Sequence, residues 1–221
     1  MACKMEANDN HKLALKIVYY GPALSGKTTN LLQLHAQLAT ERKGELMVMN
    51  TRDDRTLFFD MLPVGIRTSN GLDLRLKLYT VPGQVQHDST RKTLLSRADG
   101  IVFVADSQLG QQENNAISFD NLASNLSKVG LDIDRMPLIV QFNKRDLSDI
   151  VCEQTLKARW SATPWWPLML SSALKGHGVT ETLEELLKRL YPAVDREHGL
   201  DARYGLSQAA FLQRLTARKE R

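Results

Sequence analysis

The chain has 221 residues, of which 43% are hydrophobic and 24% charged, which is enough for one well-buried domain with an appendage. Its formal net charge of +4 is modest and its basic residues do not cluster with aromatic residues, which argues against nucleic acid as a partner. The presence of only two cysteines argues against a disulfide framework and favours a reducing, cytoplasmic compartment.

Residues 1–12 are polar, and we expect them to form a flexible N-terminal segment. They lack the apolar core of a signal peptide, and no run in the chain approaches the roughly 18 apolar residues of a membrane-spanning helix. Ala2 excludes N-myristoylation, and the C-terminal residues contain no prenylation cysteine. We therefore expect no membrane anchor.

The first predicted elements are a strand over residues 13–20 and a helix over residues 29–40, joined by a stretch that fits the pattern G-x-x-x-x-G-K-[ST]. Gly21 and Gly26 allow the backbone to turn tightly and to aim N–H groups at phosphate oxygens, while the helix N-terminus adds positive potential. Lys27 supplies a charge to the β- and γ-phosphates, and the next residue, a threonine, offers a hydroxyl to Mg²⁺. A turn could match by accident, but the flanking strand and helix are the context that a phosphate-binding loop requires.

The rest of the chain continues to alternate strand-like and helix-like segments. Residues 72–81 alternate strictly between apolar and polar side chains, which predicts a half-buried strand, with an edge position as one possibility. Residues 101–105 form a continuous apolar run ending at Asp106, which is typical of a central parallel strand. The alternation predicts an α/β domain over residues 13–191, with a mostly parallel central sheet and helices on both faces. Further strands are predicted over residues 46–50, 138–142 and 168–170, a polar loop over residues 51–56, and helices over residues 115–128, 153–162 and 179–191, the last ended by Pro192.

Two groups of hydrophobic residues are not placed by this alternation of strands and helices. In a predicted C-terminal extension over residues 192–221, Ser207 begins a helix that carries Phe211 and Leu215 on one face. We expect this helix to dock on the domain or, alternatively, on a partner. The pair Trp165-Trp166 is interpreted as capping the sheet edge, with a binding patch as the alternative.

A polar segment, Asn143-Lys144-Arg145-Asp146, directly follows the strand over residues 138–142, at the sheet edge where open α/β sheets bind ligands. The carboxylate of Asp146 can accept hydrogen bonds from both N1–H and N2–H of guanine, a donor pair that adenine lacks. Asn143 would link this segment to the phosphate-binding loop, and the aliphatic stem of Lys144 would lie against the purine ring. Alone, such a segment is more often a solvated turn. The cluster from Ser171 to Lys175 adds a backbone N–H at Ala173 for guanine O6.

A third segment, Thr80-Val81-Pro82-Gly83-Gln84, ends the alternating strand. Gly83 can bring its backbone N–H against a γ-phosphate, and the amide of Gln84 can orient an attacking water. Together these segments favour GTP as the ligand and its hydrolysis as the reaction.

In this order along the chain, the motifs resemble those of a P-loop NTPase with a Ras-like G domain, that is, a small GTPase. The resemblance is closer to the bacterial MglA group of gliding-motility and cell-polarity GTPases, and it covers residues 12–191. The segments that carry it are residues 16–22, 26–31, 54–60, 78–84, 102–108 and 143–147.

The resemblance implies a switch that alternates between GTP and GDP, in which GTP and Mg²⁺ order the loops beside the γ-phosphate and a partner binds the ordered state. It implies a small dimeric roadblock-fold activator (MglB-like) and effectors that the sequence does not identify. The implied catalytic residues are Gln84, Arg55 as an arginine finger, and Lys27, with Thr28 and Thr56 as Mg²⁺ ligands. Without the resemblance, Arg55 would be interpreted as a solvated loop charge. The implied nucleotide contacts are Gly21, Pro22, Ala23, Leu24, Ser25, Gly26, Lys27, Thr28, Thr29, Thr56, Gly83, Asn143, Lys144, Asp146, Ser172, Ala173 and Leu174.

Two positions depart from the Ras-like pattern. Thr80 stands where most Ras-like proteins have aspartate, a departure that the MglA group shares, so we expect weaker retention of Mg²⁺. Ala23 stands where glycine is usual, and its methyl group would crowd the attacking water. Three functions stay open: a GTP-hydrolysing switch, a GTP-held interaction module with little turnover, and another P-loop enzyme such as a kinase. Asp146 argues against the kinase, because a kinase does not need to read guanine.

Overall fold

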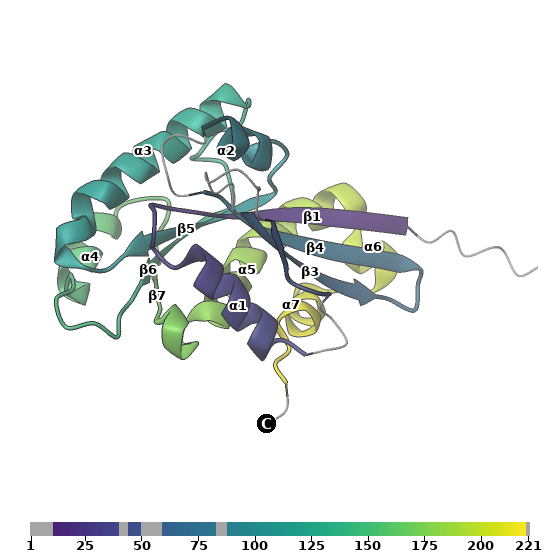
Figure 1. Cartoon of the computed structure of the whole chain (residues 1–221). Helices are drawn as coiled ribbons and strands as arrows, with labels where there is room; N and C mark the ends of the chain where they lie inside the picture. Colours follow the sequence, from purple (N-terminus) through teal and green to yellow (C-terminus); the bar gives the residue numbers. More distant parts are fainter. Residues whose placement is uncertain (1–10, 40–43, 50–58, 83–87, 220–221) are drawn as a thin grey trace, which may run out of the picture.

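The computed structural model describes residues 11–39, 44–49, 59–82 and 88–219 (Figure 1). The strands are β1 (His11–Tyr20), β2 (Met47–Met49), β3 (Phe59–Arg67), β4 (Leu72–Thr80), β5 (Gly100–Asp106), β6 (Leu138–Asn143) and β7 (Met169–Leu170). They form one sheet in the order β2-β3-β4-β1-β5-β6-β7. From β4 to β7 every neighbouring pair is parallel, whereas β3 runs antiparallel to both β2 and β4. The predicted mostly parallel sheet is therefore confirmed.

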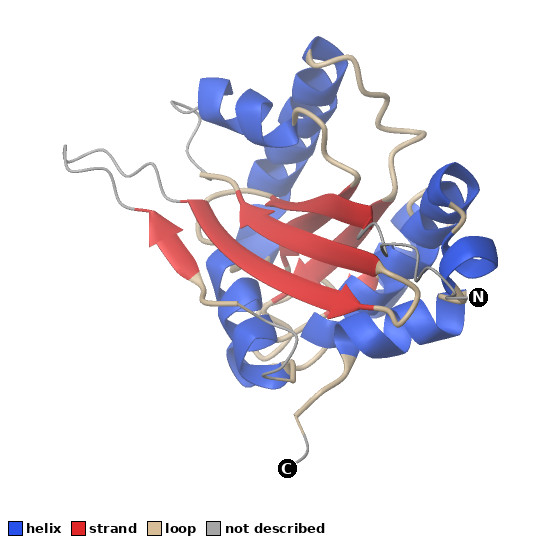
Figure 2. Cartoon of the chain, turned by 90° about the vertical axis from the view of Figure 1, so that its right-hand side faces the viewer, coloured by secondary structure: helices blue, strands red, loops and turns tan. Residues whose placement is uncertain are grey.

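Helices cover both faces of this sheet (Figure 2). They are α1 (Lys27–Gln37), α2 (Asp88–Leu95), α3 (Gln112–Lys128), α4 (Glu153–Trp160), α5 (Val179–His198), α6 (Leu200–Tyr204) and α7 (Gln208–Thr216), with 3-10 turns η3 (Leu109–Gln111) and η4 (Ala173–Lys175). Buried residues of α1, α5, α6 and α7 pack on one face, and those of α2, α3 and α4 on the other. In β5, Val102 and Val104 join the first layer while Ile101 and Phe103 join the second, which is why this strand is apolar throughout. Among the described helices, none is long and apolar enough to cross a bilayer.

The sheet differs from the sequence prediction beside β4. This strand lies between β1 and β3, so the edge position that its alternating pattern suggested is wrong. β3 was not predicted, because its pattern is interrupted by Pro63 and Gly65, two residues that are depleted in strands. α2 was not predicted either, because the segment is too polar to show a helical apolar stripe.

The helix α5 continues through Pro192 to His198, so the prediction that this proline ends the helix is wrong. Proline has no N–H to donate to the carbonyl four residues earlier, which here belongs to Lys188. The side-chain amide of Gln208, at the start of α7, donates to that carbonyl oxygen at 3.0 Å. A long-range contact thus replaces the missing backbone hydrogen bond, and the helix ends instead at Gly199 in a left-handed conformation.

The C-terminal helix α7 docks on the domain, as the first of the two sequence-based alternatives expected. Ser207 precedes it and accepts the N–H of Ala210 at 3.4 Å. Phe211 and Leu215 are fully buried, and the ring of Phe211 packs edge-to-face on Tyr191 of α5. Since α7 also contacts β3, it covers the antiparallel side of the sheet.

Candidate functional site

Residues 21–28, which we call the glycine loop, connect the buried strand β1 to α1. Gly21 has φ +146° and Gly26 has φ +98°, a region that side chains rarely adopt. A Cβ atom on Gly26 would lie 2.2 Å from Nδ2 of Asn143, and one on Gly21 would lie equally close to the carbonyl oxygen of Val104. Both glycines are therefore required by the backbone conformation and by close packing, as the motif predicted.

The side chain of Lys27 folds back over the glycine loop. Its ammonium donates to the carbonyl oxygens of Gly21 at 3.0 Å and of Pro22 at 2.6 Å, and the residue is buried. The neighbouring residues Ala23, Leu24 and Thr28 are exposed. A buried cation beside the exposed residues of a loop that leads into a helix N-terminus is suited to an anionic ligand.

Asn143, at the end of β6, joins three segments that are far apart in the sequence. Its Nδ2 donates to the carbonyl of Ser25 at 2.8 Å, so the predicted link to the glycine loop is present. Its Oδ1 accepts from the hydroxyl of Ser171 at 3.0 Å and from the N–H of Ala173 at 2.8 Å. The sequence predicts that the N–H of Ala173 faces guanine O6, but in this structure that N–H donates to Oδ1 of Asn143.

Asp146 lies in the loop after β6, where the hydroxyl of Ser172 donates to its Oδ1 at 2.6 Å. This hydrogen bond is the main reason that the pKa of the Asp146 carboxyl is lowered from its ordinary value. The carboxylate is therefore ionised at neutral pH and acts only as an acceptor. Asp146 and Ser172 border an open hollow of about 320 Å³ whose wall also includes Lys175. An acceptor pair held in this way can receive two neighbouring N–H donors of a ligand.

The remaining predicted residues fall into two groups. Thr80 ends β4 beside Tyr19 of β1, so it lies next to the start of the glycine loop, and it is buried. In η4, Leu174 is exposed beside Ala173, and Thr29 follows Thr28 in the first turn of α1. The other predicted residues, Arg55, Thr56, Gly83 and Gln84, lie outside the described residues, as does the polar loop predicted over residues 51–56.

Sequence reasoning missed Asp106, which the structure places opposite Lys144. The ammonium of Lys144 lies 2.6 Å from Oδ2 of Asp106, across the ends of β5 and β6. Lys144 itself has φ +66°, which is uncommon for a residue with a side chain. The position of Asp106 at the end of an apolar strand could have marked it as a candidate site residue. Its partner could not be predicted, because nothing in the sequence pairs it with a lysine 38 positions away.

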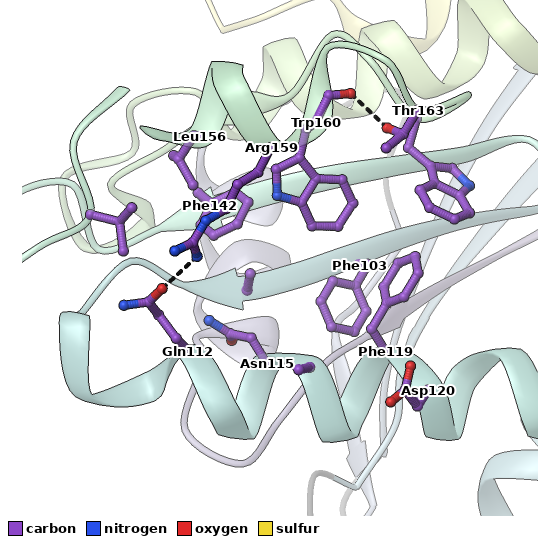
Figure 3. Close-up of a pocket in the computed structure, with 14 residues that line it drawn as sticks. Phe103, Gln112, Asn115, Phe119, Asp120, Phe142, Leu156, Arg159, Trp160 and Thr163 are labelled. Carbon is purple, nitrogen blue, oxygen red and sulfur yellow. Dashed lines mark hydrogen bonds between the residues drawn. The ribbon is translucent and has the colours of Figure 1, made fainter. Parts of the chain in front are cut away.

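A second cavity, of about 380 Å³, lies behind the ends of β5 and β6, between α3 and α4 (Figure 3). Phe103, Phe119 and Trp160 line it, and Arg159 donates to Gln112 across it at 2.6 Å. Trp165 also lines it and packs against Phe119 with ring centroids 4.9 Å apart, which favours the packing interpretation of this tryptophan over a binding patch. Trp166, by contrast, is 37% exposed.

Comparisons with known proteins agree with this arrangement. The model of the ADP-ribosylation factor family matches residues 3–190, so α6 and α7 lie outside the matched residues. The chain is also similar to the mutual gliding-motility protein MglA of Myxococcus xanthus (strain DK1622). The two are 43% identical over 179 residues, which cover 81% of this chain and 91% of that relative.

Proposed function

We propose that this chain, which belongs to the ADP-ribosylation factor family of Ras-like small GTPases, is an MglA-like switch. In this proposal it alternates between GTP and GDP and hydrolyses GTP. The observation that carries the proposal is the junction at Asn143. One side chain ties the glycine loop to the segments that hold Asp146 and Ala173. Phosphate recognition and base recognition are thereby fixed relative to each other, which a guanine nucleotide site needs.

In this proposal the glycine loop, from Gly21 to Thr28, holds the phosphates by its N–H groups and by Lys27. Asp146 reads guanine through the two donors on the Watson–Crick edge of the base, because an ionised carboxylate offers two acceptor oxygens and the hydroxyl of Ser172 holds it in place. The stem of Lys144 and the turn at Ser172 to Leu174 complete the base site.

The residues present fit a magnesium ion. Thr28 directly follows Lys27 in the first turn of α1 and is exposed, so its hydroxyl is available as a metal ligand at the helix N-terminus. With Thr56 it would hold Mg²⁺, which supplies charge neutralisation to the phosphates. Gln84 orients the attacking water, and Arg55 neutralises charge in the transition state. Thr80 has no carboxylate, so we expect Mg²⁺ to be held less tightly than in the Ras-like proteins that have aspartate at this position.

The partners follow from the same premise. A roadblock-fold activator binds the GTP state and helps to place Arg55 and Gln84, and effector proteins bind while GTP is present. The similarity to a protein named for gliding motility supports a role in motility. The proposal extends this role to cell polarity and places it in the cytoplasm. Residues 13–191 form the switch domain, and residues 192–221 are a C-terminal extension added to it.

A second candidate function is a GTP-held interaction module with little turnover. The observation in its favour is Ala23, an exposed residue of the glycine loop whose methyl group occupies space that a glycine leaves empty. Nucleotide binding is unaffected in this alternative, because the backbone N–H groups remain.

Single-turnover phosphate release from the GTP-loaded full chain distinguishes the two candidates. A switch releases phosphate, faster with the activator, and Gln84→Leu removes most of that rate while GTP stays bound. No release in the presence of an activator that binds the protein would favour the module. Failure to bind GTP at all would refute both.

A further inference from the structure

The ion pair between Lys144 and Asp106 is largely shielded from solvent. The side chain of Asp106 is 5% exposed and that of Lys144 28%, so the pair lies at the boundary between the protein interior and the base site. Lys144 adopts a left-handed backbone conformation directly before the turn that carries Asp146. A flexible lysine in such a place needs a fixed partner if its stem is to keep one orientation.

Asp106 is itself held from several sides. The side-chain amide of Asn115, on α3, both accepts the N–H of Asp106 at 2.9 Å and donates to its carbonyl oxygen at 2.8 Å. The N–H of Gln108 donates to Oδ1 of Asp106 at 3.0 Å. Asn115 also lines the aromatic cavity of Figure 3, where its side chain points from α3 toward the sheet. The carboxylate is thus fixed before any ligand binds.

The end of β5 is also tied to the end of β6. Asp106 stands opposite Asn143 in the parallel register, and the N–H of Ser107 donates to the carbonyl oxygen of Asn143 at 2.9 Å. The anchor for Lys144 and the junction at Asn143 therefore share one rigid support.

We propose that Asp106 is a positioning residue for Lys144 and thereby determines how long guanine nucleotide stays bound. Oδ2 of Asp106 holds the ammonium, so the aliphatic stem of Lys144 is stretched in front of the base and forms one wall of its site. Without this partner the ammonium moves into solvent and the wall is lost. The inference rests on the proposed function, because it needs guanine to lie beside Asp146.

The charge of Asp106 can be separated from its structural contacts. In Asp106→Asn the amide oxygen can still accept the N–H of Gln108, and Asn115 still holds the main chain. Only the ion pair with Lys144 requires the negative charge. A matched control is Asp99, which stands just before the opposite end of β5 and accepts the N–H of Lys16 at 2.6 Å, away from the site.

The experiment measures the dissociation rate of a fluorescent methylanthraniloyl-GDP from the full chain in Mg²⁺ buffer, chased with excess GDP. Asp106→Asn should raise the rate about tenfold, as expected for a lost hydrogen bond to a charged group. Asp106→Glu, which keeps the charge, should lie nearer to the wild type, and Asp99→Asn should match it. In a Lys144→Met background, Asp106→Asn should add less than about twofold.

Several outcomes would overturn the proposal. If the wild type binds no guanine nucleotide, the proposed function fails and this inference with it. If the wild type binds but Asp106→Asn dissociates at the wild-type rate, only the inference fails. It also fails if Asp106→Asn accelerates dissociation equally with Lys144→Met in place, because Asp106 would then act through the fold. Should Asp106→Asn not fold, Asn115→Ala replaces it, with faster dissociation expected only when Lys144 is present.

Discussion

Gly26→Ala tests whether the glycine loop and Asn143 are packed as tightly as the structure indicates. The new Cβ would lie 2.2 Å from Nδ2 of Asn143, closer than carbon and nitrogen can approach. Asn143 cannot move away without losing its hydrogen bonds to Ser25, Ser171 and Ala173. The left-handed backbone costs about 1–2 kcal/mol for alanine, and a buried amide left without partners costs about 1–3 kcal/mol more. We expect a loss of about 2–5 kcal/mol in the free energy of unfolding.

Gly130→Ala is the matched control. Gly130 also has a positive φ, +79°, but nothing lies within 4 Å of a Cβ built there. It should therefore lose only the backbone contribution of about 1–2 kcal/mol. Urea unfolding followed by circular dichroism measures both variants, and guanine nucleotide affinity should fall for Gly26→Ala alone. Equal stability losses in the two variants would show that the contact with Asn143 does not constrain the loop.

Three further predictions concern base choice, the C-terminal helix and turnover. Asp146→Asn exchanges an acceptor for an amide that can donate to O2 of xanthine, so competition binding should move from GTP toward XTP; unchanged preference would remove Asp146 from the base site. Phe211→Ala should lower the free energy of unfolding by about 3–5 kcal/mol, as measured by denaturant unfolding, and a Phe211→Ala variant as stable as the wild type would contradict the docking of α7. Gln208→Ala should lower it by only about 0.5–1.5 kcal/mol, because the hydrogen bond to Lys188 is exposed. Ala23→Gly should raise the single-turnover rate of phosphate release, because it makes room for the attacking water, and this gain should vanish in a Gln84→Leu background. An unchanged rate would show that the methyl group of Ala23 does not crowd the attacking water.

The sequence was sufficient for the parts of the site where chemistry restricts residue type and spacing. Gly26 and Asn143 lie 117 positions apart, yet each belongs to a short motif, and their contact follows once both motifs are placed at the same sheet edge. The central strand β5 could be predicted because both of its faces are buried.

Long-range compensation could not be predicted. Pro192 lies inside α5 because Gln208, from another helix, satisfies the carbonyl that the proline leaves without a donor. β3 contains Pro63, but its strand pairing is supplied by β4, a partner that the local sequence does not reveal. Asp106 likewise owes its place to Lys144 and Asn115. In each case the deciding partner is distant in the chain, and local propensity points elsewhere.

The central claim is that this fold holds a guanine nucleotide, and isothermal titration of the full chain with GDP and with ADP, both in the presence of Mg²⁺, tests it most directly. In the proposed site, Asp146, which is held by Ser172, would accept two donors that guanine has and adenine lacks. The account predicts one GDP bound per chain and at least about a hundredfold weaker binding of ADP, since unmatched polar groups in a base site carry a large penalty. Equal binding of the two nucleotides, or binding of neither, would contradict it.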